Sequence, residues 1–305
     1  MKRILLMIPI LLGVIFLIFT LMYFTPGSPG QTLAGPDAEQ VIIDQINHDL
    51  GFDQPFLIRF FNYVKGIVTR FDFGTSYFTQ KPVLPELIPR FKRTLILAFT
   101  SMVATAIIGM AIGVLSAVKQ YTLVDYASTT ISMFFSSMPS FWVGMMLLLW
   151  VAMRNSWFPI NGVDSWRGYI LPSAAMTICS AAPLLRLTRS TMLETIRSDY
   201  IRTARAKGAK NNRVIWKHAF KNALLPVVTV IGNNFRAQLG GSVIIETVFV
   251  IPGLGSYLVT SIRNKDVPSV MGCTLFMAAL FLVVILIVDI LYAYIDPRVK
   301  ARYTK

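Results

Sequence analysis

The chain of 305 residues is 54% hydrophobic and only 14% charged. An average soluble domain carries about 25% charged residues, so this composition excludes an ordinary soluble globular protein. A net charge of +14 also occurs in nucleic-acid-binding proteins, but here the basic residues are sorted along the chain in a way that favours membrane topology.

Long stretches without charged residues, and one more that is interrupted by Arg236 and Glu246, mark candidate membrane spans along the chain. Each can cross about 30 Å of hydrocarbon as a helix, and a helix satisfies its own backbone hydrogen bonds in lipid. We therefore expect one all-α integral membrane domain with six transmembrane helices, at residues 4–24, 94–118, 127–153, 168–188, 223–250 and 269–295. The expected connections include an exterior segment at 25–93, a cytoplasmic loop at 189–222 and an exterior loop at 251–268.

The first stretch follows Lys2 and Arg3, as in a signal peptide. It is longer than the apolar core of about 7–15 residues of such a peptide, and no A-x-A-like cleavage site follows closely. We expect a retained anchor, which ends at the helix-breaking sequence PGSPG at 26–30.

The exterior segment at 25–93 is too long for a loop without structure of its own. Within it, the sequence FLIRFFNYVKGIVTRF at 56–71 repeats apolar residues at helical spacing. The residues predicted to share one face are Phe56, Phe60, Tyr63, Val64 and Ile67. Two interpretations remain open: a small cap over the helix ends, which we favour, or a docking platform for a molecule outside the membrane.

Glycine and proline mark special positions in three of the spans. Gly109 and Gly113 form a G-x-x-x-G pattern, which permits close contact between helices. Pro139 in the third span and Pro183 in the fourth each remove an intrahelical hydrogen bond, so a kink is expected there.

The sequence offers few groups for catalysis, metal binding or nucleotide binding. Cys179 and Cys273 fall within apolar stretches, where packing is the expected role, and His48 and His218 are isolated. No G-x-x-x-x-G-K-[ST] sequence is present, so the usual phosphate cradle is missing. We expect no catalytic residue, no metal site and no cofactor bound by this chain itself.

The basic residues are concentrated on one predicted side of the membrane. The positions on that side are Lys2, Arg3, Lys119, the segment 186–221 and the tail after Asp296, whereas the short loops opposite hold Arg154, Arg167, Arg263 and Lys265. Because cytoplasmic loops carry an excess of Lys and Arg, both termini are expected in the cytoplasm.

The most basic segment, DYIRTARAKGAKNNRVIWKH at 199–218, has the pattern of two helices separated by a glycine. Thr191 and Glu194 predict a capping box before it, and Gly208 predicts a left-handed helix stop. Asn211 or Asn212 is expected to cap the second helix. The pairs expected at i and i+4 in that helix are Ile215 with Ala219 and Trp216 with Phe220.

Two roles suit the residues of this segment. Attraction to anionic lipid explains the charges. It does not explain the small side chains of Thr203, Ala204 and Ala206, which would let a helix seat deeply in a groove of another protein.

The sequence DYIRTARAKGAKNNRVIWKHAFKNALLP resembles the cytoplasmic loop of inner-membrane permease subunits of ABC importers, in the form found in the peptide/nickel branch. The resemblance runs nearly end to end, and the other similar stretches are RILLMIPILLGV, FTPGSPG, FDFGTSY, KPVLPELIPRFKRTLILA, ETVFVIPGLGSYLVTSIRNKDVPSV and DILYAYIDPRVK. The chain is most similar to the first of two permeases in oligopeptide or dipeptide importers, which implies the type I ABC importer permease fold. The general loop motif has Glu-Ala-Ala where this chain has Arg202-Thr203-Ala204, so the contacts of the usual Glu cannot be transferred to Arg202.

The resemblance implies that the loop is a coupling helix seated in a cleft of a cytoplasmic ATPase subunit. The implied coupling residues are Arg202, Thr203, Ala204, Arg205, Ala206, Lys207, Gly208, Ala209 and Lys210. The implied partners are two ATPase subunits that bind ATP and Mg²⁺, a second homologous permease, and an extracytoplasmic substrate-binding protein that docks on 25–93 and 251–268. The chain would form half of a pore for peptides in a bacterial cytoplasmic membrane; a nickel chelate, glutathione or an opine remain alternative substrates.

Polar residues in the fifth span are candidates for the translocation path, because they are costly in lipid. Asn233, Asn234 and Arg236 would line a wet cavity that receives a peptide carboxylate, but a bond from Arg236 to a neighbouring helix or to the second permease is the favoured interpretation. Glu246 is expected to be structural. Asp289 is expected to bond Tyr292 or a neighbouring backbone group.

Two other functional classes suit the sequence less well. An ion-driven carrier needs an intramembrane carboxylate or histidine relay, whereas deep in the expected spans only Arg236 is charged. A membrane hydrolase needs a Ser-His-Asp, paired-carboxylate or H-E-x-x-H arrangement, and the expected spans contain none of these.

Overall fold

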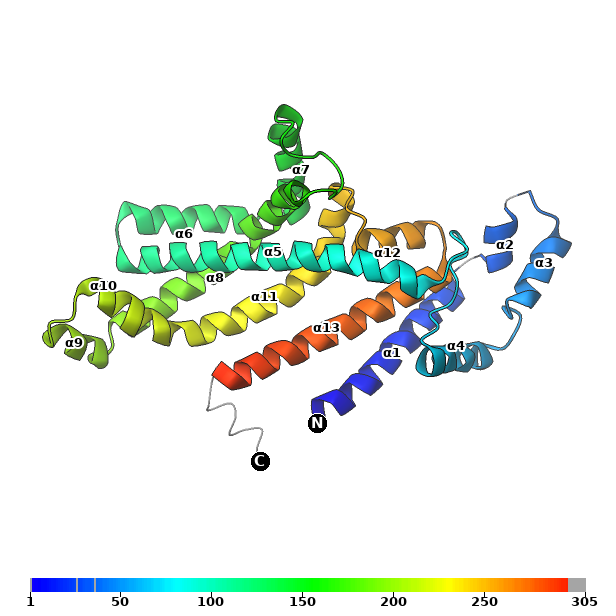
Figure 1. Cartoon of the computed structure of the whole chain (residues 1–305), viewed down its shortest axis with the longest axis horizontal. Helices are drawn as coiled ribbons and strands as arrows, with labels where there is room; N and C mark the ends of the chain where they lie inside the picture. The colour runs from blue at the N-terminus through cyan, green and yellow to red at the C-terminus, as the bar shows by residue number, and fades with distance from the viewer. Residues whose placement is uncertain (1, 26, 36, 296–305) are drawn as a thin grey trace. The chain divides into compact units, whose positions relative to one another are not determined.

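A computed structural model describes residues 2–25, 27–35 and 37–295 (Figure 1). The chain divides into two compact units. The first comprises Met1–Thr94 and Pro252–Val283, and the second comprises Leu95–Ile251 and Val284–Lys305. Helices α5 (Val83–Val118) and α13 (Val267–Ile295) each contribute one part to each unit.

Within the described residues, five helices are long and apolar enough to cross a membrane, and a bent pair makes a sixth if it counts as one broken span. The candidate spans are Leu5–Phe24, Val83–Val118, the pair Leu123–Ser136 and Ser140–Arg154, Trp166–Ile196, Asn211–Gly240 and Val267–Val288. The predicted all-helical membrane fold is confirmed.

The first unit joins α1 (Lys2–Phe24) to the segment at 25–93, which is predicted to be exterior and is called the exterior segment below. Its other helices are α2 (Pro29–Ala34), α3 (Gln40–Asp49), α4 (Phe56–Arg70), the start of α5, α12 (Leu254–Arg263) and the start of α13. Helix α4 confirms the helix predicted at 56–71, and its predicted apolar face packs on α1. The Phe19 ring of α1 lies 5.2 Å from that of Phe56 and 5.6 Å from that of Phe60, in edge-to-face contacts.

One buried carboxylate ties the segment before α5 to the loop between α12 and α13. Asp266 is 3% exposed and accepts hydrogen bonds from the Ser76 hydroxyl, the Tyr77 N–H (2.9 Å) and the Ser269 hydroxyl (2.7 Å). The Ser269 and Tyr257 hydroxyls share a further bond of 2.8 Å. Burial raises the pKa of Tyr257 to about 12, so its hydroxyl stays protonated at neutral pH. We call these five residues the exterior clasp.

The second unit contains most of the bundle. Its elements are the end of α5, α6 (Leu123–Ser136), α7 (Ser140–Trp150), η1 (Ala152–Arg154), η2 (Trp166–Tyr169), α8 (Ile170–Ile196), α9 (Asp199–Ala206), α10 (Asn211–Arg213), the π-helical η3 (Val214–Phe220), α11 (Lys221–Val248) and the end of α13. A Cβ atom on Gly113 of α5 would lie 2.7 Å from Thr188 Cβ and 2.8 Å from the Leu185 carbonyl oxygen, both on α8. The close helix contact predicted from the G-x-x-x-G pattern is therefore confirmed.

The third predicted span is two helices rather than one kinked helix. Helix α6 ends at Ser136, α7 begins at Ser140, and the two meet at an angle of 100°. Pro139 is extended, with φ −63° and ψ 136°, and a proline disfavours helical geometry in the residue before it. The single helix expected at 127–153 is therefore replaced by a helix break. Helix α8, by contrast, runs through Pro183.

Several helices extend past the predicted spans. Helix α5 begins at Val83 rather than near residue 94, and α8 ends at Ile196 rather than near residue 188. The predicted boundaries mark where charged residues begin. A helix can continue beyond that point because Arg, Lys and Glu have high helix propensity and are costly only within the lipid itself.

Candidate functional site

The segment predicted to couple to a partner forms a short helix with a sharp end. Helix α9 begins after Ser198, which is extended, and ends before Gly208, whose φ is +74°. The Ala209 N–H donates to the Ala204 carbonyl (3.2 Å) and the Gly208 N–H to the Arg205 carbonyl (2.9 Å), the pair of bonds found where a helix ends in a left-handed residue. The left-handed stop predicted at Gly208 is confirmed.

Two details of the predicted local structure are wrong. Thr191 does not cap a helix: α8 continues to Ile196, and the Thr191 hydroxyl donates to the Leu187 carbonyl (3.0 Å) within it. Asn211 does not cap the second helix either, because α10 begins at Asn211 itself, and Lys210 occupies the cap position without a side-chain bond. In the following π-helical segment, the predicted neighbours Trp216 and Phe220 do meet, with ring centroids 5.3 Å apart.

Helix α9 is anchored to the bundle by one buried side chain. Ile201 is fully buried in an apolar cluster. The other buried members of this cluster are Val114, Ala117, Met192, Val214, Ala219 and Ala223. These residues come from the ends of α5 and α8, from the π-helical segment and from the start of α11, so α9 is seated against the base of the second unit.

The predicted coupling residues lie together on the outer side of this anchor. The exposed ones are Arg202, Thr203, Arg205, Ala206, Lys207, Gly208 and Lys210, and the half-buried ones are Ala204 and Ala209. Arg202 lies 3.6 Å from the Asp199 carboxylate, but these side chains are 75% and 98% exposed, and such surface pairs contribute little to stability. The face therefore presents small and basic side chains to solvent.

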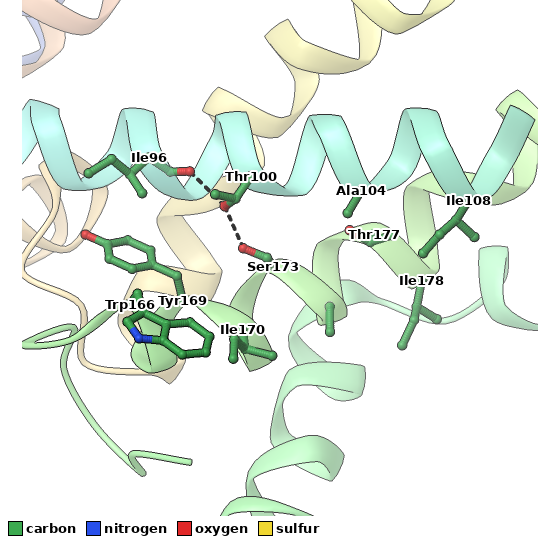
Figure 2. A pocket seen from close by; sticks show the side chains of 11 residues that line it. Ile96, Thr100, Ala104, Ile108, Trp166, Tyr169, Ile170, Ser173, Thr177 and Ile178 are labelled. Atoms are coloured by element: carbon green, nitrogen blue, oxygen red, sulfur yellow. Dashed lines mark hydrogen bonds between the residues drawn. The ribbon is translucent and has the colours of Figure 1, made fainter. Parts of the chain in front are cut away.

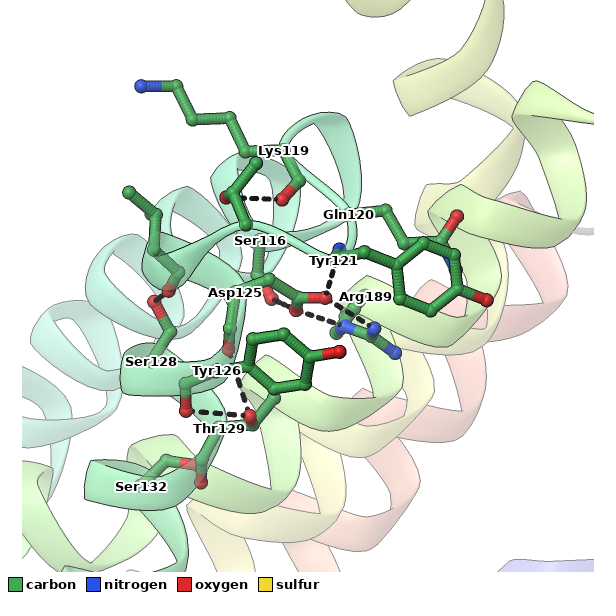
Figure 3. Close-up of polar contacts among 12 residues, drawn as sticks. Ser116, Lys119, Gln120, Tyr121, Asp125, Tyr126, Ser128, Thr129, Ser132 and Arg189 are labelled. Atoms are coloured by element: carbon green, nitrogen blue, oxygen red, sulfur yellow. Dashed lines mark hydrogen bonds and ion pairs between the residues drawn. The ribbon is translucent and has the colours of Figure 1, made fainter.

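A buried ion pair joins α6 to α8, the helix that precedes α9 in the chain (Figure 3). The Arg189 guanidinium of α8 donates two hydrogen bonds to the Asp125 carboxylate of α6, from Nε to Oδ1 at 2.6 Å and from Nη2 to Oδ2 at 2.7 Å. The Ser116 hydroxyl and the Tyr121 N–H (3.0 Å) also donate to Asp125, which is 2% exposed. These four residues form what we call the basal clamp, which joins the end of α5, the following turn, α6 and α8.

The residues predicted for a translocation path do not form one cluster. On α11, the Arg236 guanidinium donates to the Asn233 side chain (2.6 Å), one turn away on the same helix. Asn233 is exposed, whereas Asn234 is half-buried and its Nδ2 finds no hydrogen-bond partner among the described residues. Glu246 is fully buried. The predicted bond between Asp289 and Tyr292 concerns side chains outside the described residues.

A different polar residue of α11 points into the bundle. Gln238 is 4% exposed, accepts a hydrogen bond from the Ser101 hydroxyl of α5 (2.7 Å) and donates one to the Thr105 hydroxyl (3.2 Å). The sequence contains no local signal for this network, because an uncharged glutamine does not interrupt an apolar stretch as an arginine does. Gln238 links α11 to α5, and its two hydrogen bonds satisfy a side-chain amide that is buried between these helices.

A cavity of about 500 Å³ lies between α5 and the start of α8 (Figure 2). Its lining residues are Ile96, Thr100, Ala104, Ile108, Trp166, Tyr169, Ile170, Ser173, Ala174, Thr177 and Ile178. The Thr100 hydroxyl lies 2.8 Å from both the Ile96 carbonyl and the Ser173 hydroxyl, so these polar groups bond one another within the wall. The cavity thus presents an apolar surface and includes none of the predicted path residues.

The part of the chain that the structure describes contains no group of three His, Cys, Asp or Glu side chains suited to a metal ion.

The two thiols bond to backbone carbonyls: Cys179 to Met138 (3.6 Å) and Cys273 to Leu254 (3.3 Å). Both contacts agree with the packing role expected from the sequence.

Two family profiles together match nearly the whole chain. Residues 109–301 match the binding-protein-dependent transport system inner membrane component, and residues 1–98 match the N-terminal region of such components. The chain belongs to this family. It is thus the permease component of an ABC importer and a multi-pass membrane protein.

Relatives of the permease cover it almost completely. It is 40% identical over 299 residues to the glutathione transport system permease protein GsiC of Escherichia coli (strain K12), which covers 98% of this chain and 97% of that protein. The corresponding protein of Salmonella typhi is 39% identical over 300 residues, 98% of either chain.

Solved structures share the fold at lower identity. A chain of the inward-facing MetNI methionine ABC transporter has a TM-score of 0.55 at 19% identity, and the match covers 69% of the permease and 96% of that chain. A chain of an amino acid ABC transporter crystallised with histidines has a TM-score of 0.53 at 16% identity, over 70% and 94%. The predicted type I importer permease fold is confirmed.

The basal clamp, like the Gln238 network, was not predicted from the sequence. Asp125 falls just before the predicted third span, and Arg189 was counted only as part of the basic cytoplasmic side. A signal was present, because the acid Asp125 and the base Arg189 stand next to the ends of two predicted spans on the same predicted side of the membrane. Their pairing requires knowing that α6 and α8 are neighbours, which composition does not provide.

Proposed function

We propose that the permease forms one half of the pore of an ATP-driven importer for short peptides, and that glutathione, a tripeptide, is the first substrate to test. The support is the identity of 40% with GsiC over 98% of the chain, together with the resemblance to the oligopeptide and dipeptide branch. GsiC and the oligopeptide and dipeptide branch are both named for substrates of one chemical class, short peptides with a free carboxylate. Nickel chelates and opines are competing substrates within the same family.

We further propose that α9 and the turn after it couple this pore to ATP hydrolysis. The observation that carries this proposal is the two-sided character of α9: Ile201 is fully buried in the bundle, while Thr203, Ala206 and Gly208 are exposed. A helix with small exposed side chains can fit closely into a groove. Because Ile201 fixes α9 in the apolar cluster, a movement of α9 moves the packed helices with it. The exposed bases Arg205 and Lys207 favour a groove with acidic walls.

The proposal assigns the remaining tasks to partners. Two cytoplasmic ATPases bind ATP and Mg²⁺ and hydrolyse the nucleotide, and the permease itself performs no chemistry. A second, homologous permease completes the pore. A substrate-binding protein delivers the peptide from outside to the segments at 25–93 and 251–268, and both termini of the permease lie in the cytoplasm, as the distribution of Lys and Arg predicts.

A steric block on α9 tests this proposal. Ala206 is exposed, so Ala206→Trp leaves the fold intact but prevents close seating in a groove, whereas Ala206→Ser is a matched control of small volume. The permease is co-expressed with the proposed second permease, ATPases and binding protein, purified and reconstituted. Uptake of labelled glutathione and of a dipeptide is then measured with and without ATP.

We expect ATP-dependent uptake in the wild type and in Ala206→Ser, and loss of both uptake and ATPase co-purification in Ala206→Trp. Uptake by the permease without any ATPase would overturn the proposal in favour of an ion-driven carrier. Uptake of neither peptide, with ATPase coupling intact, would overturn only the substrate assignment.

A further inference from the structure

Helix α4 has two apolar faces, and the described part of the chain covers one of them and leaves the other exposed. The face of Phe56 and Phe60 packs on the aromatic rings of α1. The adjacent stripe of Leu57, Phe61 and Val68 remains 60%, 66% and 71% exposed. At about 100° per residue these three side chains align along the helix. An apolar strip next to the α1 contact is therefore open.

A polar and basic face adjoins this stripe. Its exposed side chains are Lys65, which lies one turn from Phe61 at the border, and Thr69, Asn62 and Arg70, with the 49% exposed Ile58 between Lys65 and Thr69. The helix contains no Asp or Glu. A wide apolar arc beside a basic face is typical of helices that lie in the plane of a membrane interface, and anionic headgroups complement such a face.

The contacts with α1 place α4 at the depth of lipid. Helix α1 is itself a candidate span, Leu5–Phe24, and it exposes Leu17 and Leu21 as a lipid-facing helix does. Its Phe16 ring lies 5.9 Å from that of Phe56. At about 1.5 Å per residue, Phe16 is roughly 12 Å below the end of the span. Interfacial helices bury their apolar face by about 5–10 Å, a similar depth.

We propose that α4 is an interfacial helix, embedded in the membrane leaflet on the side of the exterior segment. Leu57, Phe61 and Val68 contact phospholipid acyl chains, and Lys65 and Arg70 contact headgroups. This surface continues the lipid-facing surface of α1, which is why phospholipid rather than protein is its partner. The proposal goes beyond peptide transport and does not depend on the substrate or on the coupling role of α9.

Site-directed spin labelling of the intact transporter complex tests the placement. Labels are introduced singly as Phe61→Cys and Val68→Cys on the stripe, and as Asn62→Cys and Thr69→Cys on the neighbouring polar face. All four positions are exposed, so the labels need not disturb the fold. The complex is reconstituted in vesicles of phosphatidylethanolamine and phosphatidylglycerol. Collision of each label with oxygen, which partitions into lipid, is compared with collision with a water-soluble nickel chelate.

For positions 61 and 68 we expect an oxygen-to-nickel collision ratio severalfold higher than for positions 62 and 69. A high nickel accessibility at 61 and 68, equal to that of their neighbours, would mean that the stripe faces water and would overturn the proposal. Low accessibility to both reagents would mean that another protein covers the stripe, which overturns it as well. Each outcome can be read whether or not the complex transports glutathione.

Discussion

Asp125 and Arg189 are separated by 64 positions in the sequence and form a two-bonded ion pair that is buried at Asp125. The pair does more than join α6 to α8. Because Asp125 also accepts bonds from Ser116 and from the Tyr121 backbone, the ends of three helices share one carboxylate. Helix α8 continues from Arg189 to Ile196, just before α9, so the clamp holds the helix that leads directly into the segment for which we propose the coupling role.

Breaking the clamp should cost stability, because its loss leaves a cation without its partner. We expect Asp125→Asn to lower the free energy of unfolding by about 3 kcal/mol, toward the low end for a broken buried pair, since the Arg189 side chain remains 25% exposed. Thermal or denaturant unfolding of the purified complex measures this effect. The double variant Asp125→Asn/Arg189→Gln should lose less than the sum of its single variants.

The control is a second Asp–Arg pair, which lies within α9. Asp199 lies 3.6 Å from Arg202, but its side chain is 98% exposed, so Asp199→Asn should leave the unfolding midpoint unchanged. Equal effects of Asp125→Asn and Asp199→Asn would show that burial of the clamp carries no energetic weight.

Gly208 should be replaceable according to backbone preference rather than size. Its φ is +74°, and a Cβ atom built on it meets nothing within 4 Å. A left-handed conformation costs a residue with a Cβ about 1–2 kcal/mol, more for β-branched residues and less for asparagine. We therefore expect Gly208→Asn to keep the most ATP-dependent uptake, Gly208→Ala to keep less and Gly208→Val to keep the least. A steric requirement of the partner would instead rank the variants by volume, with Ala retaining more uptake than Asn.

The coarse fold and the turn after α9 were predictable because their signals are local. Stretches with few or no charged residues marked the spans, and a glycine between two helical patterns marked the turn. Features that depend on which helices are neighbours were not predictable. The bonds of Gln238 to Ser101 and the pair Asp125–Arg189 join distant positions, and the patterns contain nothing that connects them. The capping box predicted from Thr191 and Glu194 is a false local signal: α8 continues through Thr191, whose hydroxyl bonds to a carbonyl within the helix.

Gln238 should tolerate an apolar residue better than an acid. Gln238→Leu removes two hydrogen bonds between membrane helices, worth about 1 kcal/mol in total, and Ser101 keeps a bond to the Ala98 carbonyl. Gln238→Glu places an unpaired charge among buried groups and should cost about 3 kcal/mol or more at neutral pH. Unfolding midpoints of the two variants measure the difference, with Gln54→Glu, at an exposed glutamine, as the control. A larger loss in Gln238→Leu than in Gln238→Glu would contradict the assignment of Gln238 to a dry site.

The exterior clasp should respond to loss of one charge even though the side-chain shape is kept. Asp266 accepts three hydrogen bonds, and an amide in its place offers one acceptor oxygen and turns its other end into a donor. Because a hydrogen bond to a charged group contributes about 1.5–3 kcal/mol, Asp266→Asn should destabilise the segment before α5 by about 2 kcal/mol and speed its cleavage by a protease added outside. Asp53→Asn, at an exposed aspartate of the same segment, should leave the cleavage rate unchanged. If both variants were cleaved at the wild-type rate, Asp266 would not be what holds the exterior segment to the loop before α13.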